Sequence, residues 1–197
     1  FSGMSQSMNL CDVFRRRLFD CRGKGRAMNE MWTADSIGKE YGGRLVLNSP
    51  NIINLCLDSY DNERQRGKLY HQYTPDAIVF ATLFEAFGRM EQLYDKLCYP
   101  QAATRIRSFS EGRPKPAYGS TLESPSEKRE EIKVMESFEE MIGHRGRDAT
   151  FLIRVKCRQN SSWQGEVTWV DEQKRKYFRS ALELIRLIDS AMGAADD

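Results

Sequence analysis

Ligands for metal ions are scarce in this sequence. Its 197 residues include only two histidines, His71 and His144, and neither has a cysteine, histidine or carboxylate partner at ligand spacing. The cysteines are odd in number and lack a CxxC pair, whereas zinc sites use close spacings and disulfide frameworks use even sets. We therefore expect no metal, no cofactor and no disulfide framework, and the reducing cytoplasm as the compartment. The cysteines are Cys11, Cys21, Cys56, Cys98 and Cys157.

Long apolar runs and catalytic motifs are also missing. No run reaches the roughly 18 apolar residues of a membrane span, and no secretory signal is visible. The sequence contains no GxSxG, HExxH, phosphate-loop or dinucleotide-binding pattern. Glu85 and Glu183 stand at helix-capping positions, which explains them without catalysis. These absences predict a protein that is not an enzyme and does not enter a membrane. An enzyme without a recognisable motif, such as one with a lone reactive cysteine, remains an alternative.

Neither sign of charge predominates. The chain has 30 basic and 28 acidic residues, which gives a formal net charge of only +2. This balance excludes a simple polycation for nucleic acid but permits a local basic patch. An apolar fraction of 40% allows one domain, or two small ones, to bury a core. The opening Phe1-Ser2-Gly3 resembles an expression remnant, which predicts a native start at Met4 or Met8.

The last stretch, residues 150–193, has the pattern of a ββ(β)α unit. Apolar residues at positions 151–157 alternate with mostly cationic ones, which predicts a strand with one buried face. A polar turn leads to a second strand over residues 163–169, and residues 174–178 are a candidate third strand. Ser180 and Glu183 have the spacing of a capping box, and a helix follows that ends at Gly193.

The same pattern occurs earlier in the chain at an offset of 98 residues, without a gap. Gly67 and Phe80 align with Gly165 and Phe178, and the strand alternation and the capping box align as well. A small unit buries its apolar face poorly when alone. We therefore expect the two units to pack as a pseudo-symmetric pair around a shared core. Chance similarity between two units of one common type is the alternative.

Further segments complete the predicted organisation. Residues 1–43 form a basic N-terminal segment with a helix over residues 8–21, and the first unit spans residues 44–100. Residues 101–123 are rich in Ser, Gly and Pro and predict a linker. Residues 124–143 predict an acidic amphipathic helix, because Ser124, Pro125 and Glu127 match the start of a helix. The predicted fold is α+β, with two pseudo-repeated ββ(β)α units in antiparallel sheets, an N-terminal helix and an inter-repeat amphipathic helix.

Basic residues concentrate at two places. Three cations alternate along the strand at residues 154–158 and should share its exposed face, with more cations at residues 174–176 and aromatics at Trp163 and Tyr177. Cations among aromatics on an open sheet suit single-stranded nucleic acid, although a solvated sheet face also uses lysine and arginine. The N-terminal cations suit either an arm for phosphate backbones or a docking helix. The candidate residues for binding nucleic acid or a partner are Arg154, Lys156, Arg158, Lys174, Lys176, Arg15, Arg16 and Arg17.

The runs QGEVTW (residues 164–169) and YFRSALELIRLIDSAM (residues 177–192) resemble a family of small bacterial proteins without a settled function. Members of this family occur in gut Gram-positive bacteria and on mobile elements. The resemblance covers mainly the two units and carries no catalytic residues. The association with mobile elements implies a regulator or inhibitor of nucleic-acid machinery, such as an anti-CRISPR protein.

The combined prediction is a cytoplasmic regulatory or interaction protein without enzymatic activity. Its expected partner is a protein or a nucleoprotein, bound through exposed sheet and helix faces. Direct binding of RNA or DNA through the basic sheet face is the alternative.

Overall fold

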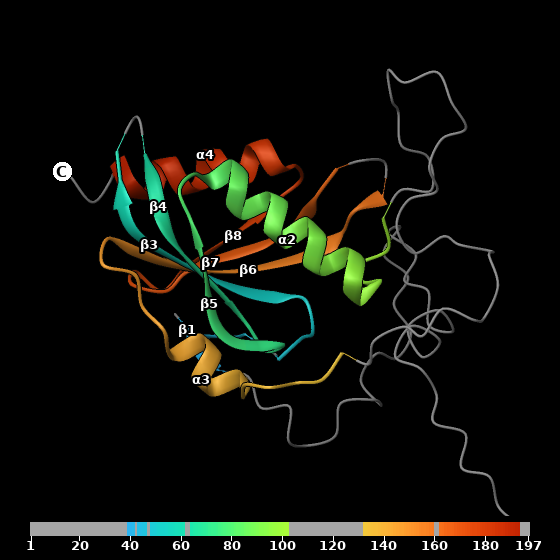
Figure 1. Ribbon diagram of the computed structural model, residues 1–197. Helices are drawn as coiled ribbons and strands as arrows, with labels where there is room; N and C mark the ends of the chain where they lie inside the picture. Colours follow the sequence, from blue (N-terminus) through green and yellow to red (C-terminus); the bar gives the residue numbers. More distant parts are fainter. Residues whose placement is uncertain are drawn as a thin grey trace, which may run out of the picture.

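The computed structural model describes residues 39–41, 43–46, 48–61, 64–102, 132–159 and 162–193. Its centre is an antiparallel sheet of six strands in the order β5-β4-β3-β6-β7-β8. Helices α2 (Leu83–Leu97) and α4 (Ala181–Gly193) cover one face of this sheet, and α3 (Phe138–Gly143) lies on the other (Figure 1). The predicted α+β class is confirmed. The strands are β3 (Ile52–Tyr60), β4 (Gln65–His71), β5 (Thr74–Phe80), β6 (Ala149–Cys157), β7 (Gln164–Trp169) and β8 (Lys174–Phe178).

The central strands β3 and β6 are buried on both faces. Towards α2 and α4, Leu55 and Ile153 belong to the larger core cluster. Towards α3, Ile52 and Leu152 pack with Met141 in a second cluster. Each such side chain contributes about 1.5–3 kcal/mol by leaving water. The sheet therefore has one helix-covered face, which we call the α2/α4 face, and an opposite α3 face that is covered only in part.

Two glycines mark irregularities in the sheet. Gly67 on β4 pairs with Leu57, and Gly165 on β7 pairs with Val155. A Cβ atom at either glycine would collide with a backbone carbonyl oxygen across the ladder and with the ring of Phe80 or Phe178. The register shifts directly after both pairs, as in a β-bulge. Beyond a bulge the alternation of side chains between the two faces is reversed.

Both long helices begin at the predicted capping residues. The hydroxyl of Thr82 accepts a hydrogen bond from the backbone N–H of Glu85 at 3.2 Å. At the start of α4 the hydroxyl of Ser180 accepts one from the N–H of Glu183 at 3.1 Å. These bonds satisfy donors that the first helical turn leaves free. At its other end α2 finishes in a left-handed residue, Cys98.

The predicted acidic helix over residues 124–143 is wrong for residues 132–137. The described helix α3 begins only at Phe138, with Ser137 as its N-cap and Glu140 completing a capping box. The preceding segment is not helical, because the N–H groups of Met135 and Glu136 both donate to the carbonyl oxygen of Gln72. Residues 124–131 lie outside the described residues.

A small hairpin, β1 (Lys39–Tyr41) and β2 (Arg44–Val46), lies on the α3 face and adds Tyr41 and Val46 to the second cluster. The N-terminal helix predicted around Arg15, Arg16 and Arg17 lies outside the described residues, as do residues 103–123 of the predicted linker.

Candidate binding surface on the sheet

Two of the predicted cations meet on the α3 face. Arg154 and Lys156 both form ion pairs with Glu166, at 2.7 and 2.9 Å. Glu166 lies directly opposite Arg154 across the β6–β7 ladder, and its side chain is only 9% exposed. One nearly buried carboxylate therefore holds two cations whose side chains are 23% and 44% exposed.

Strand β8 extends this group towards the edge of the sheet. Tyr177 lies opposite Glu166, and Arg175 lies opposite Thr168. The Nε of Arg175 donates a hydrogen bond to the Thr168 hydroxyl at 3.3 Å. Tyr177 is 62% exposed, and the Lys156 ammonium lies 5.3 Å from its ring centroid. We call these five residues the β6–β8 cluster: Arg154, Lys156, Glu166, Arg175 and Tyr177.

The third predicted cation of this strand does not share the face, so that prediction is wrong. The bulge between Val155 and Cys157 reverses the alternation and turns Arg158 towards α2. Its side chain is 1% exposed and pairs with Glu91 at 2.9 Å and Asp95 at 2.8 Å. Its Nε also donates to the carbonyl oxygen of Pro100. Arg158 therefore attaches the end of β6 to α2 and is unavailable to a ligand.

Trp163 belongs to the same buried network. Its indole N–H donates to Glu91 Oε2 at 2.8 Å, and its ring packs against Tyr94 and Phe87. The sequence grouped Trp163 and Tyr177 as aromatics beside the cations, but the ring of Trp163 packs on α2 and does not join the cluster. Tyr177 alone of the two is an exposed ring.

Lys174 and Lys176 lie on the α2/α4 side of β8. They face Trp169 and Val167 across the ladder and alternate with the buried Phe178. Lys174 pairs with Glu172 at 3.2 Å, and its ammonium lies 5.5 Å from the Trp169 ring centroid. The structure therefore separates these two lysines from Arg154 and Lys156 by the thickness of the sheet.

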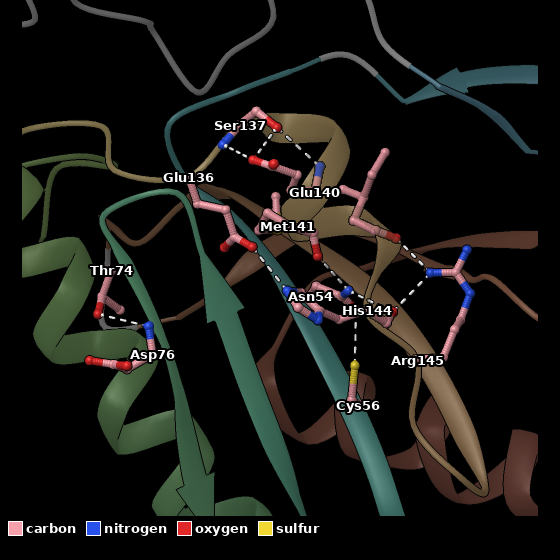
Figure 2. Close-up of polar contacts among 11 residues, drawn as sticks. Asn54, Cys56, Thr74, Asp76, Glu136, Ser137, Glu140, Met141, His144 and Arg145 are labelled. Carbon is pink, nitrogen blue, oxygen red and sulfur yellow. Dashed lines mark hydrogen bonds and ion pairs between the residues drawn. The ribbon is translucent and has the colours of Figure 1, made fainter.

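A second polar group lies where α3 meets the sheet (Figure 2). The amide of Asn54 donates to the carbonyl oxygens of Met141 and His144, at 2.9 and 3.0 Å. Arg145 donates to the carbonyl oxygens of Ile142 and His144. The last carbonyl groups of a helix have no partner within it. These bonds therefore satisfy the end of α3 and attach it to β3.

The side chain of His144 completes this attachment. Its Nε2 lies 2.9 Å from Glu136 Oε1, and its ring stacks on Tyr70 with centroids 3.7 Å apart. These contacts join the segment before α3 to the residue that follows it and to β4. The role of this polar group is therefore to attach α3 to the sheet. The sequence did not reveal it, because its members are far apart in the chain.

Burial suppresses the chemistry of the nearby thiol and of the other histidine. Desolvation, aided by the charge of Asp58, raises the pKa of the Cys56 thiol to about 12, so it stays protonated and weakly nucleophilic at neutral pH. Desolvation likewise lowers the pKa of His71 to about 4, and its Nδ1 accepts the backbone N–H of Tyr73. Both groups are neutral in the fold near pH 7.

Among the described residues, no three histidine, cysteine or carboxylate side chains gather closely enough to hold a metal ion. No helix in that part of the chain is long and apolar enough to cross a membrane. Comparison with protein-family models gave no match, and neither the curated proteins nor the solved structures gave a significant one.

Proposed function

We propose that this protein is a non-enzymatic binding protein of the cytoplasm that recognises a regulatory partner through the β6–β8 cluster. The observation that carries the proposal is the gathering of three cations and an exposed tyrosine on one open sheet face, around a single carboxylate. The three cations and Glu166 leave a formal charge of +2 on this surface.

We propose further that β3–β5 with α2 and β6–β8 with α4 are copies of one βββα unit. The offset of 98 residues relates the pair Leu57–Gly67 to the pair Val155–Gly165, together with the bulge that follows each. The same offset relates the capping bonds at the starts of the two helices. Agreement in register, bulge and cap at one offset supports duplication over chance similarity.

The contacts between the two units support the same proposal. Tyr60, at the end of β3, donates a hydrogen bond to Asp189 on α4. At the corresponding positions, Arg158 at the end of β6 pairs with Glu91 on α2. Each strand end thus contacts the helix of the other unit, as expected for a pair related by a pseudo-two-fold axis.

A cross-strand ion pair on the α3 face is reversed in sign between the units. Lys68 pairs with Asp58 at 3.8 Å in the first unit, and Glu166 pairs with Lys156 at 2.9 Å at the corresponding positions of the second. The two units have therefore diverged on this face while the pair itself is present in both. The cations of the cluster occur only in the second unit, where Arg154, Lys156, Arg175 and Tyr177 replace Cys56, Asp58, Ala77 and Val79.

The chain itself covers part of the α3 face. There Asn54 is fully buried and bonded to the end of α3. In the second unit Lys156 and Tyr177 are exposed. Among the described residues, the cations and the exposed ring gather only in the second unit, so this is where we place the partner.

The test is affinity capture from bacterial lysate with tagged protein, in parallel with and without nuclease. Lys156→Gln with Tyr177→Ala should abolish the retention of whichever macromolecule the wild type holds. The matched control is Lys68→Gln, which removes a lysine of nearly equal exposure, 45% against 44%, from the same face and a similar ion pair. Retention that is equal in all three proteins would contradict the proposal.

A further inference from the structure

We infer that the ligand of the β6–β8 cluster is single-stranded nucleic acid. The inference rests on the proposed function and names the class of its partner. It follows from three features of the cluster: its remaining positive charge, the fixed position of its cations, and its exposed ring.

The charge of the cluster complements a phosphate backbone. Glu166 offsets one of the three cations, and because its side chain is only 9% exposed, incoming phosphates do not meet it at the surface. What faces the solvent is the 44% exposed side chain of Lys156, beside the 23% exposed side chain of Arg154. A negatively charged ligand therefore meets cations on the surface and the compensating anion beneath them.

The cations are held in position before any ligand arrives. Glu166 binds Arg154 and Lys156 at 2.7 and 2.9 Å, and Thr168 accepts a hydrogen bond from Arg175. Long basic side chains normally lose rotamer freedom when they bind. Holding them in the unliganded fold reduces that loss. Successive rows of the cluster, at Tyr177 and Arg175, are about 7 Å apart along the strand direction, since two residues of a strand span that distance.

The exposed ring selects single strands over duplexes. Tyr177 is 62% exposed and lies on the edge strand, in direct register with Glu166. A tyrosine ring stacks on any unpaired base, whereas base faces inside a duplex are covered by their neighbours. The Lys156 ammonium lies over one face of this ring, 5.3 Å from its centroid, so the base would stack on the other face. An acidic protein surface would use the cations but would gain little from stacking on the ring.

The experiment is fluorescence anisotropy with the purified full chain and labelled mixed-sequence RNA, single-stranded DNA and duplex DNA. Three phosphate contacts on a single strand predict a slope of about −2 in log affinity against log salt, or about 20-fold weaker binding at ~200 than at ~50 mM salt. The RNA and single-stranded DNA arms show whether one of the two is preferred. Binding as tight to duplex DNA as to single strands would overturn the inference.

Variants separate stacking from charge. Tyr177→Ala should weaken binding about tenfold, whereas Tyr177→Phe, which keeps the ring, should stay close to the wild type. Lys156→Gln should reduce the magnitude of the salt slope by about 0.7, while Lys68→Gln should leave it unchanged. Each variant replaces an exposed side chain, and its thermal unfolding midpoint verifies that it folds.

The inference is overturned if no single strand binds even at ~50 mM salt, or if Lys68→Gln weakens binding as much as Lys156→Gln. The proposed function survives that failure if capture from lysate is nuclease-resistant and still depends on Lys156 and Tyr177, because the partner is then a protein. If neither single-strand binding nor capture from lysate depends on Lys156 and Tyr177, both the inference and the proposed function are wrong.

Discussion

The assignment of Arg158 to the interior gives the sharpest prediction about stability. Its side chain is 1% exposed and donates to Asp95 at 2.8 Å, to Glu91 at 2.9 Å and to the carbonyl oxygen of Pro100 at 2.8 Å. Its guanidinium also lies 5.5 Å from the ring centroid of Tyr94. Arg158→Ala therefore removes a buried charge with its partners left in place, together with a packed aliphatic stem.

The magnitude follows from the exposure of those partners. Breaking a buried ion pair from one side costs about 3–5 kcal/mol when the remaining charge stays buried. The side chains of Glu91 and Asp95 are 43% and 26% exposed, so water reaches both carboxylates. Arg158→Ala should therefore lower the free energy of unfolding by about 3 kcal/mol, the lower end of this range. Arg158→Met keeps most of the stem and should cost less, about 1–2 kcal/mol. Glu91→Gln should cost less than about 1 kcal/mol, because Asp95 still pairs with the arginine.

The assay is equilibrium unfolding in urea, followed by tryptophan fluorescence and by circular dichroism. A loss of 3 kcal/mol is a large part of the roughly 5–15 kcal/mol that holds a domain together. The control is Lys156→Ala, two residues earlier on the same strand, which removes a 44% exposed cation and should cost at most about 1 kcal/mol. Equal losses for the two variants would refute the argument that the bulge buries Arg158. Arg158→Met should also leave nucleic-acid affinity unchanged, whereas a surface role for this cation requires the affinity to fall.

The remaining predictions concern the sheet, the buried histidine and the helix caps. Gly67→Ala and Gly165→Ala should each bring a Cβ atom against a carbonyl oxygen and a phenylalanine ring. Each variant should therefore lower the free energy of unfolding in urea titrations by about 1–3 kcal/mol or more, and by similar amounts. A large loss at one of the two sites only would contradict the proposed equivalence of the units. Because burial lowers the pKa of His71 to about 4, the unfolded chain binds a proton that the fold excludes as the pH falls from about 6.5 to 4, and stability decreases through this window. In the wild type, the free energy of unfolding should be up to about 3 kcal/mol lower at about pH 4.5 than at about pH 7, as measured by urea titrations. His71→Gln should remove this difference. If the variant shows the same difference as the wild type, other groups cause the loss of stability. Thr82→Ala and Ser180→Ala each remove the acceptor for the backbone N–H at the third helical position. Each should lower the free energy of unfolding by about 1 kcal/mol, measured by thermal unfolding. A change below about 0.3 kcal/mol would show that water replaces the cap.

The local structure of the two long helices and most strands could be read from the sequence. Alternation of apolar and polar residues depends on neighbours two positions apart, and helix caps depend on neighbours three positions apart, so both are visible in a short window. The caps of the two long helices, Thr82 and Ser180, were identified in this way. The strand at residues 174–178 and the α+β class were also recognised from the sequence. Glycines 67 and 165 were visible as a matched pair, although their steric reason was not.

Three decisions depended on contacts between distant residues. A bulge opposite Gly165 moved Arg158 from the expected exposed face into the α2 interface, because one extra residue reverses a period of two. The hydrogen bonds of residues 135 and 136 to the carbonyl oxygen of Gln72 excluded those residues from the predicted helix. The antiparallel pairing of β3 with β6 placed both units in one sheet and left β5 and β8 at its edges.

The candidate surface shows the same division. The sequence alone determined that cations alternate along residues 154–158 and that an aromatic residue follows at Tyr177. Only the tertiary structure decided that Glu166 neutralises part of that charge, that Lys174 and Lys176 lie on the opposite side, and that α3 covers part of the face around Asn54. Charge and periodicity are properties of neighbouring residues, whereas burial and ion pairing depend on which distant segments the fold brings together.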